Sequence, residues 1–221
     1  MERKITFTED EYYHLYNRGV EKRCIFMDKN DRLRFVRLLI AANSDQRFVF
    51  RDIEHKHLGE IPRGNPLVAI GAYVLMSNHF HILVKEIRDG GISAFMEKLQ
   101  TGYASYFNRR HSRVGALFQG TFRAQHVDSD RFLKYLFSYI HLNPIKTIEP
   151  QWKEDGIKDR RRAWKFLKEY ADSSFADYSG AKRDRSIILS PDAFPAYFSS
   201  HSDFTQHIDD WFDYRNILYD T

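Results

Sequence analysis

The sequence is poor in cysteine and in long apolar runs, and we expect no export signal. Its only cysteine, Cys24, excludes an internal disulfide framework and a cysteine-rich zinc site. The longest nearly apolar run covers residues 68–76, whereas a membrane-spanning helix needs ~20 apolar residues. Met1 to Lys4 leads into polar residues and not into the apolar stretch of a signal peptide. We therefore expect a soluble, cytoplasmic protein without a membrane contact.

The chain also lacks a strong excess of charge of either sign. Lys and Arg number 34 against 30 Asp and Glu, so the net charge is +4, which is weak evidence for a polyanionic partner. Positive charge is nevertheless concentrated in two segments. Residues 158–168 hold six basic residues and one acidic residue, and residues 109–123 hold four arginines and no acidic residue. Each segment fits either a nucleic-acid contact or an ordinary solvated face.

Apolar side chains are plentiful, because 43% of the 221 residues are hydrophobic and 15% are aromatic. This composition excludes wholesale disorder, and the length predicts one domain with an appendage. We place the domain at residues 1–150 and a C-terminal extension at residues 151–221. The extension has weaker periodic signals and contains basic, aromatic and serine-rich stretches. We expect it to pack on the domain or to bind DNA.

Alternating strands and helices are predicted for the domain. Strands are expected at residues 12–16, 68–76, 79–85 and 118–127, with a two-residue turn at Ser77 and Asn78. Helices are expected from Asp28 to residue 42, over residues 93–110 with Ser93 as cap, and from Asp128 or Ser129 to the residue before Pro144. Residues 44–66 read as a hairpin or long loop. The order predicts an α+β fold, a ferredoxin-like sandwich with a mostly antiparallel sheet, helices on one face and a C-terminal tail.

The first candidate for chemistry is a pair of histidines that opens a predicted strand. His79 and His81 flank Phe80, and side chains alternate between the two faces of a strand. Both imidazoles therefore point to the same side, where they can hold a divalent metal ion. The same spacing also occurs on ordinary half-exposed strands, so the pattern alone does not decide between a ligand pair and two surface histidines.

The second candidate lies near the end of the last predicted helix of the domain. Tyr139 and Asn143 are four residues apart, so they lie one above the other on a single helix face. Tyr135 extends the same line one turn earlier. The expected core stripe of this helix contains Phe132, Leu136 and Ile140, and Tyr139 lies at its edge, where it can face a cleft. A tyrosine in such a position serves either packing or catalysis.

Together, the two motifs resemble the single-tyrosine transposases of the HUH endonuclease superfamily, most closely the REP-associated branch. The resemblance runs through residues 11–180. The matching segments are Tyr13 to Gly19, Ile25 and Phe26, Ala72 to His81, Tyr106 to Arg110, Gly115 to Gly120, Tyr139 to Lys146, and Ser173 to Tyr178. The family usually has proline at the position of Ser77, a basic residue near Thr121, and Ala-Gly at the positions of Thr147 and Ile148. These differences leave the substrate specificity open.

The resemblance implies a function and a set of site residues. It implies metal-dependent nicking of single-stranded DNA and strand transfer, with Tyr139 as the nucleophile of a 5′-phosphotyrosine intermediate. His79, His81 and Asn143 would hold Mg²⁺ or Mn²⁺, and an amide oxygen suits such hard cations. The implied substrate is a single-stranded or hairpin DNA from repeated elements. A monomer that acts in cis is favoured and a homodimer is possible, in the cytoplasm and at the nucleoid during the reaction.

Basic residues are the candidates for DNA contacts, with Tyr103 and Phe118 available to stack on unpaired bases. The candidate arginines are Arg18, Arg109, Arg110, Arg113, Arg123, Arg160, Arg161 and Arg162. Two other functions remain open. One is a domesticated nucleic-acid-binding protein without turnover, and the other is a metal-dependent nuclease that uses water in place of the tyrosine.

Overall fold

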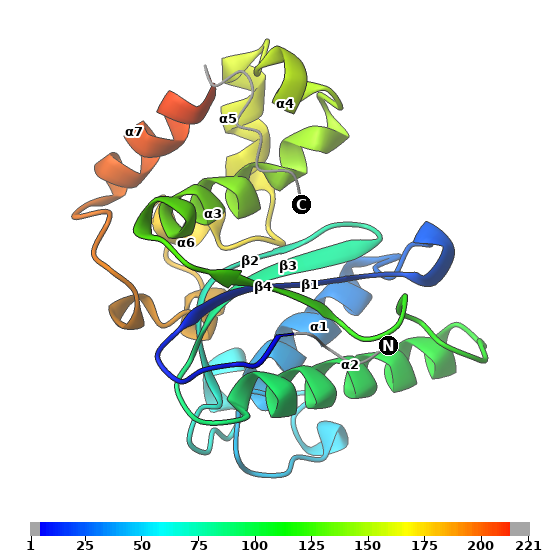
Figure 1. Ribbon diagram of the computed structural model, residues 1–221. Helices are drawn as coiled ribbons and strands as arrows, with labels where there is room; N and C mark the ends of the chain where they lie inside the picture. The colour runs from blue at the N-terminus through cyan, green and yellow to red at the C-terminus, as the bar shows by residue number, and fades with distance from the viewer. Residues whose placement is uncertain (1–4, 213–221) are drawn as a thin grey trace.

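The computed structural model describes residues 5–212, which fold around a four-stranded antiparallel sheet (Figure 1). The strands are β1 (Tyr12–Arg18), β2 (Val68–Leu75), β3 (His79–Glu86) and β4 (Arg123–Val127). Their spatial order is β2-β3-β1-β4, so the first strand of the chain lies between β3 and β4. The predicted α+β class and antiparallel sheet are confirmed.

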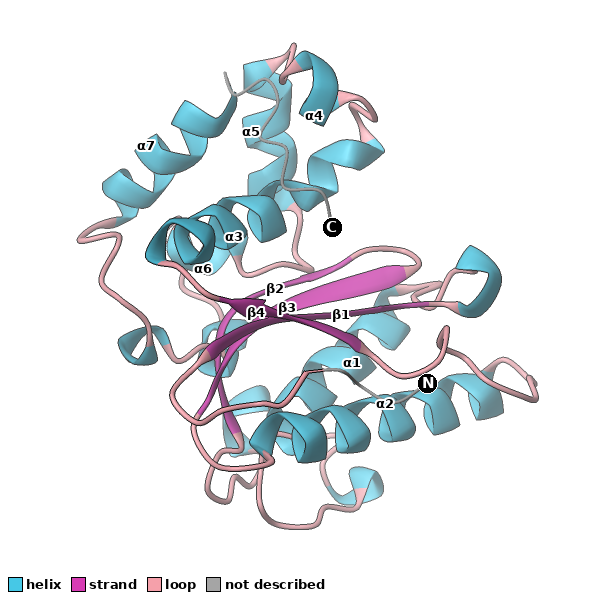
Figure 2. Ribbon diagram, in the orientation of Figure 1, coloured by secondary structure: helices cyan, strands magenta, loops and turns pink. Residues whose placement is uncertain are grey.

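Helices cover both faces of this sheet (Figure 2), so the prediction of helices on one face is wrong. The helices α1 (Lys29–Ala41) and α2 (Gly91–Arg110) lie on one side, and α3 (Asp130–Leu142) lies on the other. The reason is visible in β2, which is buried at every position. A strand with apolar side chains on both faces must be covered on both. The nearly continuous apolar run at residues 68–76 indicates this two-sided burial in the sequence.

Local chemistry explains most helix boundaries. The Asp28 side chain accepts hydrogen bonds from the backbone N–H groups of Asn30 and Asp31, and the Ser129 side chain caps α3 in the same way. The α2 helix begins at Gly91 and is capped by Gly90, so the predicted cap at Ser93 is wrong. The predicted strand at residues 118–127 is limited to β4, because Gly120 has a left-handed φ of +78° that interrupts an extended chain.

The end of α3 differs from the prediction in a way that affects the site. The α-helix ends at Leu142, but Asn143 before the proline keeps helical angles (φ −51°, ψ −38°). A 3₁₀ helix, η4 (Asn143–Thr147), follows directly. Asn143 therefore remains one helical turn beyond Tyr139 and on the same face. The other 3₁₀ segments are η1 (Val20–Lys22), η2 (Phe50–Asp52), η3 (Leu58–Glu60), η5 (Asp184–Ile188) and η6 (Pro191–Ala193).

The extension places its α-helices on the α3 side of the sheet, whereas its η5 segment packs against α1 and η3 (Figure 1). It contains α4 (Trp152–Asp155), α5 (Arg160–Glu169), α6 (Phe175–Tyr178) and α7 (His201–Phe212). Their apolar side chains form a cluster of their own with Leu142 and Ile145, at the end of α3 and in η4. Within residues 5–212, no helix is both long and apolar enough to cross a membrane.

Two larger clusters fill the space above and below the sheet. Phe80 and Ile82 of β3 point toward α1 and α2, where Phe80 packs on Phe35 with ring centroids 4.9 Å apart. Leu83 points to the other side, into the cluster under α3. Because strand side chains alternate, His79 and His81 must also face α3. The core packing of β3 thus decides which helix the two histidines meet.

Candidate active site

The register of the sheet surrounds the two histidines with side chains of β1. Tyr16 pairs with His81 and Arg18 pairs with His79 across the antiparallel ladder. Directly paired residues project from the same face, so these four side chains share the surface under α3. The rings of Tyr16 and His81 lie 5.7 Å apart, centroid to centroid. The centroids of His79 and His81 are separated by 5.1 Å, with the ring planes at 90°.

Each histidine has its Nδ1 atom engaged by a neighbour. The Nδ1 of His79 lies 2.6 Å from Oδ1 of Asn78, an oxygen that can only accept a hydrogen bond. The Nδ1 of His81 lies 2.8 Å from Nε2 of His14 on β1. An engaged Nδ1 fixes the ring orientation and leaves Nε2 as the atom that can bind a ligand.

The environment keeps these imidazoles neutral at ordinary pH. Burial lowers the pKa of His79 to about 4, with help from the positive charge of Arg18, and a hydrogen bond with Asn143 opposes the shift. Burial and the neighbouring His14 and His79 hold the pKa of His81 well below its usual range. Burial lowers the pKa of His14 to about 3. Neutral imidazole is the form that binds a metal ion.

The end of α3 brings Tyr139 and Asn143 onto the histidines. The Tyr139 ring meets His81 edge-on at a centroid distance of 5.6 Å, and it stacks on Tyr135 at 5.7 Å. Asn143 is 5% exposed, and its Nδ2 donates weakly to the carbonyl oxygen of Tyr139 at 3.5 Å. The helix packs over the sheet of its own chain, so all four residues predicted for the reaction come together within one molecule.

A pocket of about 360 Å³ lies where these elements meet. Four of its lining side chains are cationic and none is an acid. The lining residues are Tyr16, Asn17, Arg18, His79, His81, Gln119, Arg123, Tyr139, Asn143, Lys146 and Lys153. A concave site with positive charge and no carboxylate favours an anionic occupant. Tyr139, the two imidazoles and the cations thus face one space that fits a phosphate group.

The predicted DNA-binding arginines lie in three places. Arg18 and Arg123 line this pocket. The α2 helix lies on the opposite face of the sheet, and there Arg110 forms ion pairs with Asp28 and Asp31, both at 2.6 Å. Arg109 and Arg113 belong to the end of α2 and the loop after it. Arg160, Arg161 and Arg162 open α5, where Arg160 pairs with Asp209 at 2.7 Å. DNA contacts by any of them stay predictions.

Sequence reasoning missed six residues around the pocket: His14, Tyr16, Asn17, Gln119, Lys146 and Lys153. For His14 and Tyr16 a signal existed, because they alternate with Arg18 along one strand and therefore share its face. Gln119 reaches the site from the loop between α2 and β4, where its N–H donates to the carbonyl oxygen of Arg18 at 2.8 Å. No short-range pattern marks such a loop residue.

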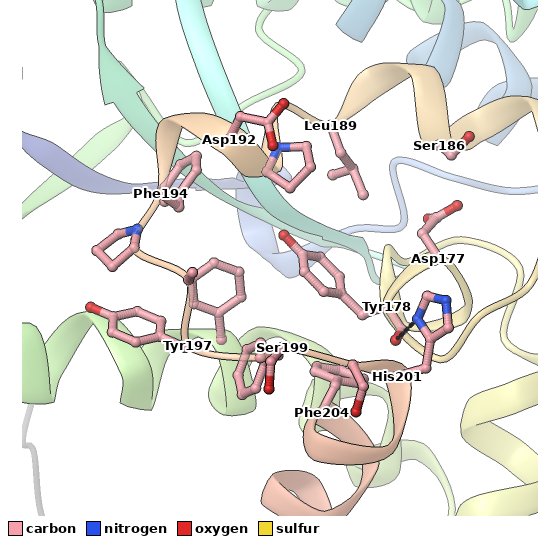
Figure 3. A pocket seen from close by; sticks show the side chains of 16 residues that line it. Asp177, Tyr178, Ser186, Leu189, Asp192, Phe194, Tyr197, Ser199, His201 and Phe204 are labelled. Atoms are coloured by element: carbon pink, nitrogen blue, oxygen red, sulfur yellow. Dashed lines mark hydrogen bonds between the residues drawn. The ribbon is translucent and has the colours of Figure 1, made fainter.

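A larger cavity of about 810 Å³ lies elsewhere, between α3, α6 and the segment that leads to α7 (Figure 3). Its walls are mainly apolar and include Tyr178, Phe194 and Tyr197. Asp177 and Asp192 are the carboxylates of its lining, and Asp177 is held by Arg183. None of the residues predicted for catalysis lines this cavity, so its size does not make it the reactive site.

The donor set of the smaller pocket fits a metal ion only if an amide is included. Among the described residues, no group of three or more His, Cys, Asp or Glu side chains is placed to hold a metal. His79, His81 and Asn143 nevertheless line the same pocket, and the rings of the two histidines are neighbours. Two imidazoles with free Nε2 atoms and one amide oxygen suit Mn²⁺ or Mg²⁺ with open positions for substrate.

A family model described as "Transposase IS200 like" matches residues 12–143, which is more than half of the chain. This chain belongs to the IS200-like transposase family. The matched segment contains His79, His81 and Tyr139 and ends on Asn143. The family places the protein among transposases, which process DNA. Lys146 and the extension with Lys153 lie beyond the matched residues.

Solved structures support the transposase fold. A REP-associated tyrosine transposase, solved in complex with a REP hairpin, superposes with a TM-score of 0.52 at 13% identity, covering 90% of this chain and 96% of that one. The tRNA(His) guanylyltransferase of Saccharomyces cerevisiae gives a TM-score of 0.39 at 10% identity, covering 87% and 82%, which is too weak a likeness to support an inference. No curated protein matches the chain in sequence.

Proposed function

We propose that this transposase nicks single-stranded DNA and rejoins it through a phosphotyrosine formed on Tyr139. The observation that carries the proposal is the convergence of Tyr139, His79, His81 and Asn143 on one cationic pocket without an acidic residue. A phosphodiester brings one negative charge into such a pocket, and its neighbouring phosphates add more. The family membership supports a DNA substrate.

The chemistry exchanges one phosphodiester for another. The Tyr139 oxygen forms a bond to the phosphorus, the bond from phosphorus to the 3′ oxygen of the preceding nucleotide breaks, and the phenolic proton ends on the released 3′-hydroxyl. The downstream strand then remains attached to Tyr139 through its 5′ phosphate. A 3′-hydroxyl that attacks this linkage reverses the steps and joins two strands. The stack on Tyr135 and the edge contact with His81 keep the Tyr139 ring oriented.

A divalent cation, Mg²⁺ or Mn²⁺, would be held by His79, His81 and Asn143. When bound, it would supply positive charge against the phosphate oxygens as negative charge develops there. Arg18, Arg123 and Lys146 add fixed positive charge around the same space. Their contribution resembles the cationic clamps that stabilise transferring phosphoryl groups in other enzymes.

The substrate we propose is a hairpin with a single-stranded flank, and the active form is a monomer that cuts in cis. The similarity to a transposase bound to a REP hairpin supports the hairpin. The assembly of β1, β3 and α3 around one pocket supports action in cis, because no second chain is needed to complete the set of site residues.

The experiment that tests this function uses hairpin oligonucleotides labelled at either the 5′ or the 3′ end, with Mn²⁺ or Mg²⁺. We expect the 3′ label to move with the protein on a denaturing gel and the 5′ label to appear in a shorter, free fragment. Cleavage without any protein-linked label would instead indicate a nuclease that uses water. Binding without cleavage of any hairpin tested would indicate a nucleic-acid-binding protein without turnover.

A further inference from the structure

The wall of the pocket that faces the Tyr139 ring comes from the extension and not from the family-matched segment. Lys153 on the short helix α4 places its Nζ 4.2 Å from the centroid of the Tyr139 ring. A cation within ~6 Å of an aromatic face is held by the ring quadrupole. The preceding residue, Trp152, is 6% exposed and belongs to the apolar cluster of the extension, so it anchors α4 in this position.

The Lys153 ammonium shares its pocket with other cationic side chains. The pocket that it lines contains Arg18, Arg123 and Lys146 and no carboxylate. Partial desolvation lowers the pKa of Lys153 to about 8, and the charge of Lys146 adds to this effect, against the influence of Glu154. Elsewhere in the extension, Lys158 forms an ion pair with Asp155 at 2.7 Å. Such a pair is not found for Lys153 within residues 5–212, so its charge is available to a ligand.

We propose that Lys153 is a catalytic residue that binds the reacting phosphate beside Tyr139. This inference rests on the proposed function, since it assigns a further role within the same site. The ammonium lies against the Tyr139 ring, offers three N–H donors, and forms no ion pair with a carboxylate among residues 5–212. A phosphate in line with the Tyr139 oxygen would accept from it as negative charge accumulates on the phosphate oxygens. The extension would thereby complete the active site of its own chain.

A set of three variants separates this role from a structural one. Lys153→Met keeps a long apolar side chain over the Tyr139 ring and removes the charge, whereas Lys153→Arg keeps the charge. Lys182→Met is the matched control, because Lys182 is an exposed lysine of the extension outside the basic segment 158–168 and its loss changes the net charge equally. For each protein, the measurements are the melting temperature, the Kd for a labelled hairpin, and the rate of adduct formation at saturating protein.

We expect Lys153→Met to slow adduct formation about 100-fold, as expected when one donor to a developing oxyanion is lost. Its melting temperature and hairpin Kd should stay close to the wild-type values. Lys153→Arg should recover most of the rate, and Lys182→Met should react like the wild type.

The proposal is overturned if Lys153→Met forms the adduct at the wild-type rate, or if its defect disappears at saturating protein. It is equally overturned if both Lys153 variants form the adduct slowly and also melt at a lower temperature. That pattern would indicate a packing role for Lys153. A wild-type protein that forms no adduct at all would instead refute the proposed function, which distinguishes the two failures.

Discussion

The imidazoles of His14 and His81 share a hydrogen bond of 2.8 Å, between Nε2 of the first and Nδ1 of the second. The two rings are nearly parallel, with centroids 5.0 Å apart and planes at 19°. His14 is 2% exposed and His81 7%. A buried strand residue thus fixes the ring of a proposed metal ligand on the neighbouring strand, in the way that outer groups orient ligating histidines in metal sites.

The first prediction concerns His14. Replacing it by leucine should weaken Mn²⁺ binding about 10- to 100-fold, because the His81 ring loses the partner that orients it. His14→Gln keeps a polar partner for the His81 ring, so its Mn²⁺ affinity should fall less. Titration calorimetry with Mn²⁺ on the folded proteins measures both, and His126→Leu on β4 is the control, since His126 contacts Glu11 at the surface. Unchanged Mn²⁺ affinity in His14→Leu would contradict the assignment.

The second prediction contrasts two arginines. Arg18 lines the cationic pocket, so Arg18→Ala should weaken hairpin binding and lower the salt dependence by about one phosphate contact. Arg110 is engaged with the fully buried Asp31, so Arg110→Ala should mainly lower the free energy of unfolding, by about 1–3 kcal/mol. Salt-dependent binding curves and urea denaturation of both variants check this. Equal losses of DNA affinity in the two variants would show that the pocket does not set the DNA contact.

The third prediction concerns pH and His141, which is fully buried in α3 and shares a hydrogen bond of 2.7 Å with the Ser174 hydroxyl. Burial lowers its pKa to about 3. The unfolded chain therefore binds a proton below pH ~6.5 that the folded chain does not, and stability falls as pH drops through this range. Between pH 7 and 5 this residue alone should cost about 2 kcal/mol of unfolding free energy.

A pair of variants checks the pH effect. In His141→Gln that portion of the pH dependence should disappear, even if the variant is less stable at every pH. In His55→Gln the dependence should stay as in the wild type, because the His55 side chain is 90% exposed. Urea denaturation at pH 7 and pH 5 gives the comparison. An unchanged slope with pH in His141→Gln would show that the histidine is not held neutral.

The parts of the fold that depend on local chemistry were predictable from the sequence. The caps at Asp28 and Ser129, the turn at residues 77–78, and the order of strands and helices in the domain are confirmed. Each depends on residues close together in the chain. The same holds for the shared faces of His79 with His81 and of Tyr139 with Asn143, which follow from the periods of a strand and a helix.

The parts that depend on long-range pairing were not predictable. Nothing local in the strand of His14 indicates that it pairs with β3, so the contact with His81 emerges only from the sheet order. The α4 helix has four residues and no periodic signal, and Lys153 reaches the site because Trp152 is buried in the extension. In α5 only Ala163 and Leu167 are buried, which is too sparse an apolar pattern to predict the packing of a helix.

The most direct test of the account compares Tyr139→Phe with Tyr135→Phe. The two tyrosines stack on one helix face, but Tyr139 alone of the two lines the pocket with His79, His81 and Asn143. With a 3′-labelled hairpin and Mn²⁺, Tyr139→Phe should bind the DNA and form no covalent adduct, while Tyr135→Phe should form it. An adduct that persists in Tyr139→Phe, or one lost only in Tyr135→Phe, would contradict the assignment of Tyr139 as the nucleophile.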